Sequence, residues 1–153
     1  NRLLIVASKG TADALYPALI LATTAASQNM AVDIYFTFGG MKLLLKGMTE
    51  TIKPSVDLGI SQEELTRLLQ KGGMPTLKDM LKMAKDMGVK IHACSPTMNL
   101  FNLKEEDLTK EVCDDIIGAA TFLEMASDPN IIHFNIFPIC YILNRRRVGW
   151  WYT

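Results

Sequence analysis

One cysteine stands where a thiol can act as a nucleophile. Cys94 follows an apolar run at residues 89–93 and precedes Pro96, which marks a helix start. At such a junction, backbone N–H groups and the positive end of the helix dipole converge on the side chain. That environment lowers the pKa of a thiol and favours the reactive thiolate. Free cysteine is also among the most buried residue types, so the position alone leaves two interpretations open, a functional thiol or a small core residue.

The other residues with reactive side chains are weaker candidates. His92 lies two residues before Cys94, on the same face of the expected strand, and a Cys/His pair suits nucleophilic catalysis. Neighbours on one face of a strand are usually too far apart for direct contact, however, and a third orienting group is missing. Cys113, expected inside a strand, and Cys140, in an apolar tail, are interpreted as core residues. Cys113 is a resolving thiol only if the fold brings it close to Cys94.

Two turns and several residue clusters are further, weaker candidates for a functional site. Residues 8–11, Ser-Lys-Gly-Thr, offer a lysine beside backbone N–H groups, but their spacing matches neither a P-loop nor a GxGxxG motif. Gly39 and Gly40 permit a tight turn. The carboxylates at 105–107 and 114–115 are interpreted as solvent-facing, and the methionines between 80 and 87 as core or interface. The sequence has no CxxC or paired-His motif, so we predict neither a metal site nor a cofactor.

Composition limits the class of protein. The chain has 153 residues, of which 49% are hydrophobic and 21% charged, as expected for one globular domain. A net charge of zero gives no basis for nucleic-acid binding, and three cysteines exclude a disulfide-stapled secreted scaffold, so we expect a reduced, cytoplasmic protein. The charge-free stretches at 14–32 and 129–144 are interrupted by polar residues and proline, so a membrane anchor is not expected.

Strands and helices alternate along the chain. Apolar and β-branched runs predict strands at residues 2–7, 31–37, 89–93, 112–117 and 130–136. Helical spacing and capping residues predict helices at 12–28, 41–46, from Ser61 onward, 76–87, 98–100 and 118–126. Pro17 should bend the first helix or delay its start. The pattern predicts an α/β fold, a three-layer α/β/α domain with a mostly parallel sheet of about five strands.

In such a sheet, ligands bind beyond the C-terminal ends of the strands. The segments to consider are therefore residues 8–11, 37–40 and 94–98.

These segments also carry a family resemblance. The matching stretches are Lys-Gly-Thr-Ala-Asp at 9–13, Tyr-Pro-Ala-Leu-Ile-Leu-Ala at 16–22, Phe-Thr-Phe-Gly-Gly at 36–40, Gly-Val-Lys-Ile-His-Ala-Cys at 88–94, Met98 with Leu100, and Gly-Ala-Ala-Thr-Phe-Leu at 118–123. In this order they resemble the DsrE/DsrF/DsrH-like sulfur-relay proteins, specifically their larger DsrE-like subgroup. The resemblance covers residues 3 to about 136.

The resemblance implies a cytoplasmic α/β domain that forms homo-oligomers and exchanges sulfur with TusA-like or rhodanese-like carriers. It implies that Cys94 is the sulfur-carrying residue. Residues 1–136 would form the domain, with a helical insertion at about 47–75, and residues 137–153 a tail without a family counterpart. The family often has Gln after this cysteine, whereas Ser95-Pro96 follows here.

The hypothesis from the sequence is that the Cys94 thiolate accepts a sulfane sulfur or thiosulfonate group and passes it to an acceptor thiol. This is group carriage, so whether the protein is an enzyme stays open. The residues expected to bind around Cys94 are Lys9, Gly10, Thr11, Thr37, Gly39, Ser95, Thr97 and Met98. Two alternatives remain: a non-catalytic oligomeric interaction subunit, and a thiol-disulfide redox protein that uses Cys94 and Cys113.

Overall fold

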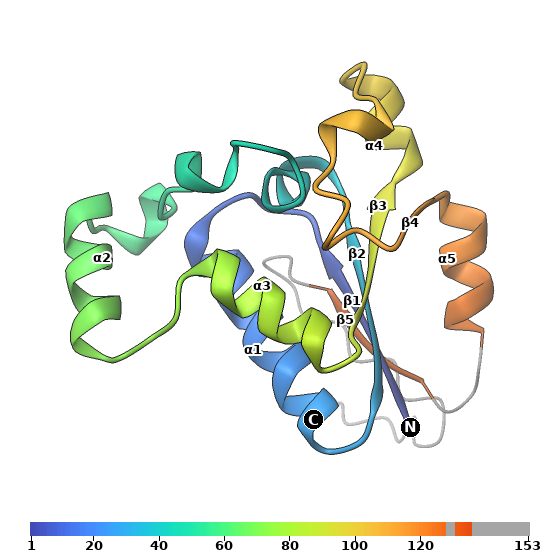
Figure 1. Cartoon of the computed structure of the whole chain (residues 1–153), viewed down its shortest axis with the longest axis horizontal. Helices are drawn as coiled ribbons and strands as arrows, with labels where there is room; N and C mark the ends of the chain where they lie inside the picture. The colour runs from blue at the N-terminus through green and yellow to red at the C-terminus, as the bar shows by residue number, and fades with distance from the viewer. Residues whose placement is uncertain (128–130, 136–153) are drawn as a thin grey trace, which may run out of the picture.

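The computed structural model describes residues 1–127 and 131–135 (Figure 1). Its strands are β1 (Arg2–Ala7), β2 (Ala31–Phe36), β3 (Lys90–Cys94), β4 (Asp115–Ile117) and β5 (Ile131–Asn135). They form one parallel sheet in the order β4-β3-β2-β1-β5. The predicted tail at 137–153 and Cys140 lie outside the described residues.

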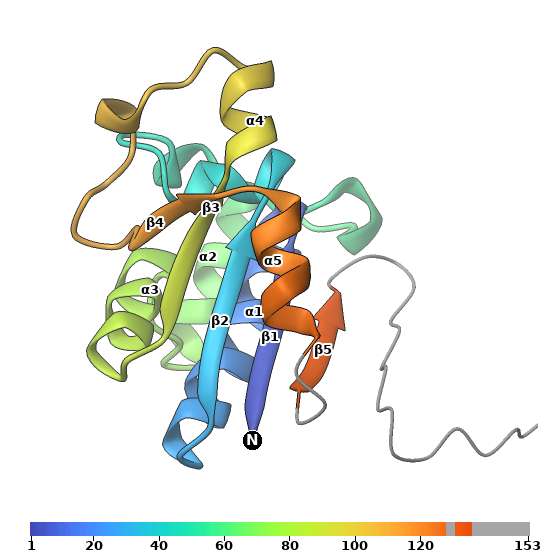
Figure 2. The same ribbon diagram turned by 90° about the vertical axis from the view of Figure 1, so that its right-hand side faces the viewer.

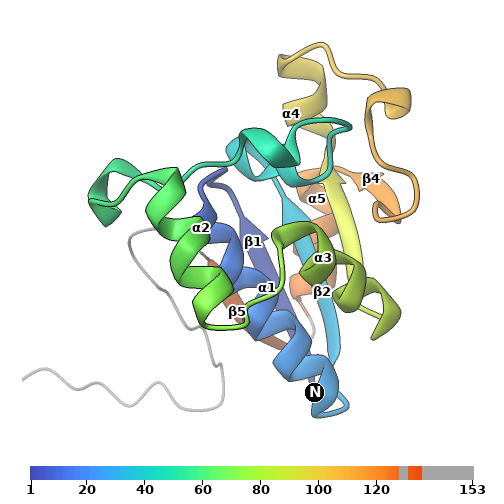
Figure 3. The same ribbon diagram turned by 60° about the vertical axis from the view of Figure 1, so that its left-hand side comes forward.

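Helices cover both faces of this sheet. The steps from β1 to β2 to β3 run in one direction, and right-handed crossovers therefore place α1 (Ala12–Ser27) and α3 (Leu77–Asp86) on one face (Figure 3). The chain then returns across the sheet to β5, so the connecting helix α5 (Ala119–Ala126) lies on the opposite face (Figure 2). The predicted three-layer α/β/α class with a parallel sheet is confirmed.

Two helix starts follow the predicted caps. Ser61 accepts the Glu64 N–H at 3.1 Å and opens α2 (Gln62–Lys71), and Thr76 accepts the Asp79 N–H at 3.1 Å and opens α3. The apolar side of α3 is buried, whereas no residue of α2 is buried. Helix α1 begins at Ala12 with Pro17 inside it, so the later start was a wrong alternative.

Three boundaries differ from those predicted. The strand expected at 112–117 is shorter and begins at Asp115, as β4. The N–H groups of Val112 and Cys113 instead donate to the Thr109 carbonyl in a turn. The short helix expected at 41–46 is a 3-10 helix at Phe38–Leu43, and further 3-10 turns lie at Thr49–Thr51, Val56–Leu58 and Glu105–Asp107. Helix α4 (Ser95–Leu100) begins three residues earlier than expected, because its first turn accepts a proline.

Buried apolar side chains form two clusters, one on each face of the sheet. The larger cluster lies between the sheet and helices α1 and α3. The smaller consists of Tyr35, Cys94 and Ile117, with Phe122 and Met125 of α5 packed against it. Within the described residues, no helix combines the length and hydropathy needed to cross a membrane.

Candidate functional site

The three predicted segments meet at one end of the sheet. They directly follow β1, β2 and β3, which are adjacent parallel strands, so their C-terminal ends share an edge. The first two turns touch so closely that a Cβ on Gly10 would lie 2.3 Å from the Gly39 carbonyl oxygen. Likewise, a Cβ on Gly40 would lie 2.0 Å from the Ala7 oxygen. The glycines are therefore needed for backbone packing at this edge.

Two threonines join the second turn to α4. The Oγ1 atoms of Thr37 and Thr97 are 3.0 Å apart, and Thr97 Oγ1 also accepts the Phe38 N–H at 3.1 Å. Phe38 has a positive φ of 44°. Because this conformation is unfavourable for a residue with a side chain, the bond to buried Thr97 helps to hold it.

Cys94 lies beside these threonines, at the end of β3 and immediately before α4. Its side chain is buried, with 4% of the residue exposed. Burial alone would raise the pKa of the thiol, but hydrogen bonds from the hydroxyls of Thr37, Thr97 and Tyr35, and from the Thr97 N–H, outweigh it. The pKa of Cys94 is therefore lowered, which favours the thiolate.

Tyr35 remains a donor in this arrangement. Burial and the hydrogen bond to Cys94 raise the pKa of its phenol, so the hydroxyl stays protonated. Its ring stacks on Phe122 of α5, with centroids 4.8 Å apart. Tyr35 was not among the predicted binding residues, although it lies two residues before Thr37, whose extended backbone continues from β2.

The other predicted binding residues are less closely connected to the thiol. Met98 packs into the larger cluster on the α1 and α3 face, not with Cys94. Lys9 is exposed, and Ser95 is half-buried. The Oγ1 atom of Thr11 is buried, and its hydroxyl contributes to the lowered pKa of Asp13 rather than to that of Cys94.

His92 occupies a polar environment that the sequence did not reveal. Its Nε2 lies 2.9 Å from Asp33 Oδ1, and its Nδ1 contacts Asp115 Oδ1. Arg2 Nε donates to Asp33 Oδ2 at 2.7 Å. Burial would lower the pKa of the imidazole, but the two carboxylates outweigh burial and raise it. The sequence alone indicated no group that could orient His92. In the structure both Asp33 and Asp115, from distant parts of the chain, do so.

Cys113 differs from Cys94 in every relevant respect. It packs against the larger cluster, whereas Cys94 belongs to the smaller cluster on the other face of the sheet. Burial and the nearby Asp115 and Asp114 carboxylates raise the pKa of its thiol to about 11. Both thiols are free. Because the two side chains pack into clusters on opposite faces of the sheet, this arrangement does not favour a disulfide between them.

Comparison with known proteins places this arrangement in a family. The model of the DsrE/DsrF/DrsH-like family matches residues 1–58 and 55–134. The chain belongs to this family. The resemblance read from the sequence motifs is therefore confirmed.

Curated relatives align along most of the chain. "Sulfur carrier protein DsrE2" of Allochromatium vinosum is 28% identical, over 86% of this chain and 96% of its own length. "Uncharacterized protein YrkE" of Bacillus subtilis is 27% identical, over 86% of this chain and 94% of its own. Among solved structures, the ychN protein from E. coli superimposes with a TM-score of 0.61 at 14% identity, over 88% of this chain and 98% of that one. This last likeness concerns the fold alone.

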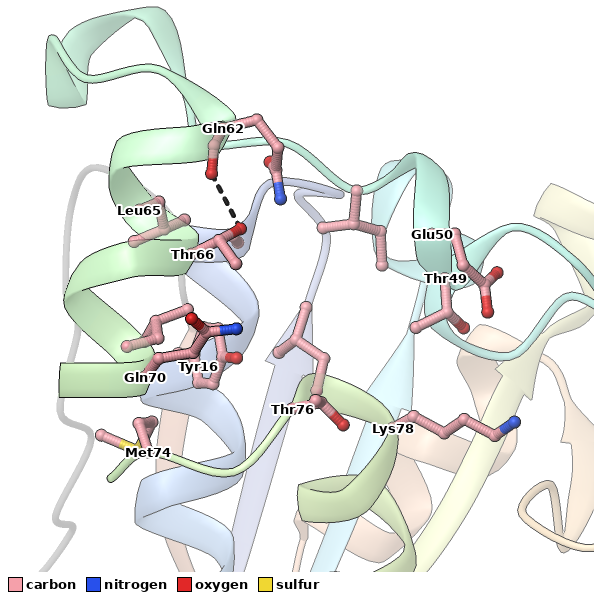
Figure 4. A pocket seen from close by; sticks show the side chains of 14 residues that line it. Tyr16, Thr49, Glu50, Gln62, Leu65, Thr66, Gln70, Met74, Thr76 and Lys78 are labelled. Carbon is pink, nitrogen blue, oxygen red and sulfur yellow. Dashed lines mark hydrogen bonds between the residues drawn. The ribbon is translucent and has the colours of Figure 1, made fainter. Parts of the chain in front are cut away.

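A separate cavity lies away from Cys94. It has a volume of about 410 Å³ and lies between α1, α2 and the start of α3 (Figure 4). Tyr16, Gln62 and Gln70 contribute to its lining, and Cys94 does not.

In the part of the chain that the structure describes, no group of three or more His, Cys, Asp or Glu residues could hold a metal ion.

Proposed function

We propose that this member of the DsrE/DsrF/DrsH-like family carries sulfur on Cys94, as a persulfide or a thiosulfonate, within sulfur trafficking or oxidation. The observation that carries the proposal is the set of neutral donors around one thiol. Three hydroxyls and one backbone N–H offset its burial and lower its pKa. The similarity to a protein named a sulfur carrier supports the same role.

The chemistry is a displacement at sulfur. The Cys94 thiolate attacks the outer sulfur of a donor persulfide, a new S–S bond forms to Cys94, and the donor's S–S bond breaks. The electron pair of the broken bond leaves with the donor thiolate. An acceptor thiolate then attacks the outer sulfur on Cys94 and regenerates the thiolate. Because one S–S bond replaces another at each step, no external oxidant or reductant is required.

Tetrathionate would load Cys94 in the same way. Attack on one of its inner sulfurs breaks the central S–S bond, expels thiosulfate and leaves an –S–SO₃⁻ group bound to the Cys94 sulfur. In both cases a negative charge remains at the end of the bound group. The hydroxyls of Thr37, Thr97 and Tyr35 are the donors nearest to this charge, and the half-buried Ser95 hydroxyl adjoins them along the chain.

The proposed partners are TusA-like or rhodanese-like carriers in the cytoplasm, and we propose that the chain forms a homo-oligomer. Exposed apolar side chains beside the site support a docking surface for a carrier. Phe38, Leu100 and Phe101 are 57%, 64% and 57% exposed, and the two phenyl rings meet edge to face with centroids 6.4 Å apart. Phe38 directly follows Thr37, and Leu100 ends α4, so these side chains come from the two segments that supply the threonine donors to Cys94.

Mass spectrometry of the intact chain after incubation with polysulfide or tetrathionate tests the proposal. We expect an adduct on the wild type and on Cys113→Ser, and none on Cys94→Ala. The Cys113→Ser variant is the matched control, because the thiol that it removes is mostly protonated near neutral pH in the wild type. An adduct that survives Cys94→Ala, or no adduct on the wild type, rejects the proposal. Unchanged carrier binding by a Cys94→Ser variant, with no sulfur loading of the wild type, would instead favour an interaction subunit.

A further inference from the structure

A row of charged side chains lies directly before the Cys94 cluster on the same face of the sheet. Asp33, His92 and Asp115 come from β2, β3 and β4 and are connected side chain to side chain. Two residues later, the same three strands carry Tyr35, Cys94 and Ile117, which form the buried cluster around the thiol. Because every second residue of a strand lies on the same face, each residue of the charged row lies next to one residue of the cluster on the same strand.

The segment that covers the thiol is weakly held otherwise. We call residues 115–126, which comprise β4 and α5, the lid. Strand β4 has only three residues at the edge of the sheet, and no residue of α5 is buried. The lid touches the thiol cluster through Ile117, Phe122 and Met125. Few buried contacts imply that such a segment opens at low free-energy cost.

Sulfur exchange requires that opening. The attacking sulfur must contact its partner sulfur directly, yet Cys94 is 4% exposed beneath Ile117 and α5. The contact between His92 and Asp115 connects a side chain of β3 to the first residue of the lid. Asp114, just before the lid, is anchored separately, because it accepts the Ile91 N–H and pairs with Lys85.

The protonation state of His92 follows from its partners. Both ring nitrogens face carboxylate oxygens, and only the imidazolium has an N–H on each nitrogen. The other charged groups nearby are accounted for. Arg2 donates to Asp33, Lys90 lies near Asp114, and Glu124, the one charged residue of α5, is exposed.

We propose that His92 is a positioning residue for the Cys94 site: held as an imidazolium between Asp33 and Asp115, it fastens the lid over the thiol. The inference rests on the proposed sulfur chemistry of Cys94. His92 touches no sulfur species in this scheme. Instead, its charge determines how often the lid opens and hence how often Cys94 meets a partner. Loss of the charge, or of Asp115, releases the lid without altering the donors of the thiol.

Alkylation of Cys94 by iodoacetamide tests the inference in a Cys113→Ser, Cys140→Ser background. Rates are divided by the thiolate fraction, measured separately by ultraviolet absorbance, so that access is separated from ionisation. Removing one charged partner at a partly exposed site should speed alkylation of Asp115→Asn about three- to tenfold. Glu124→Gln is the matched control, because it removes the same charge from the lid where the described structure shows no side-chain contact. We expect this control to label at the wild-type rate.

Two further readouts separate a lid from general destabilisation. Amide hydrogen exchange should accelerate in β4 and α5 of Asp115→Asn but not in α1. In the wild type, the normalised alkylation rate should rise as the pH passes the His92 transition, and this rise should be smaller in Asp115→Asn. Equal labelling of Asp115→Asn and Glu124→Gln overturns the inference, as does equal acceleration of exchange in α1 and α5. Neither readout uses a sulfur donor, so failure to load sulfur on Cys94 would reject the proposed function and leave the lid result separate.

Discussion

Replacing Tyr35 by Phe removes one donor to the Cys94 thiolate and little else. The ring of Tyr35 is buried and stacks on Phe122, and a phenylalanine ring can keep that contact. The hydroxyls of Thr37 and Thr97 and the Thr97 N–H still face the sulfur. The variant therefore isolates the contribution of a single phenol hydroxyl to the reactivity of the thiol.

The expected magnitude follows from hydrogen-bond energies. A hydrogen bond to a charged group contributes about 1.5–3 kcal/mol, and the lower end applies because the remaining donors can partly compensate. Since about 1.4 kcal/mol changes an equilibrium constant tenfold, the pKa of Cys94 should rise in Tyr35→Phe, and the ionisation equilibrium should shift about tenfold toward the thiol. At a pH well below both pKa values the thiolate fraction then falls about tenfold, but the more basic thiolate is about threefold more nucleophilic, so alkylation slows about threefold.

Ultraviolet titration of the thiolate measures this shift in the Cys113→Ser, Cys140→Ser background. Tyr16→Phe is the matched control. It makes the same chemical change where the hydroxyl donates to the Pro75 carbonyl at 3.0 Å, away from the site. We expect the control to titrate like the wild type. If Tyr35→Phe also titrates like the wild type, the hydroxyl does not stabilise the thiolate and the described donor set is wrong.

Two predictions concern stability. Gly40→Ala places a Cβ 2.0 Å from the Ala7 oxygen and should cost about 3 kcal/mol, whereas Gly47→Ala, at φ 70° in open space, should cost about 1 kcal/mol. Urea unfolding compares the two, and equal losses would contradict the close packing of the turns. The pKa of His92 is raised above 6.5, so its stabilisation is complete below that pH and is lost as the pH rises through the folded-state pKa. His92→Gln should lose this pH dependence, and parallel stability profiles for variant and wild type would refute the assignment.

Local patterns were sufficient to predict most of the fold. Strands β1, β2 and β3 are short, mostly apolar runs that end at turn residues, and Ser61 and Thr76 mark helix starts through their own side chains. The error at β4 arose because Val112 has a strong strand preference. Its N–H nevertheless bonds the Thr109 carbonyl, and that turn leaves only three residues to pair with β3. A propensity is a weak guide at the edge of a sheet, where few partners reinforce it.

The positions of the site residues could be predicted only for residues that follow the C-terminal ends of adjacent parallel strands. Thr37 and Thr97 follow strand ends, so the shared edge of a parallel sheet brings them to Cys94. Met98 is equally close in sequence, but helical rotation directs it into the other cluster. The partners of His92 lie 59 and 23 residues away, and their contact depends on strand register, which no local pattern specifies.

The choice of neutral donors suits a carrier that must both accept and release sulfur. A cationic partner would lower the pKa of Cys94 further, but the nucleophilicity of a thiolate falls as its pKa falls. The same cation would hold a negatively charged persulfide or thiosulfonate more tightly and slow its transfer to the next thiol. Three hydroxyls can reorient toward either the cysteine sulfur or the outer atoms of the bound group. The charged row of Asp33, His92 and Asp115 lies two residues before the thiol cluster on each strand, where in the proposed scheme it holds the lid without binding the sulfur.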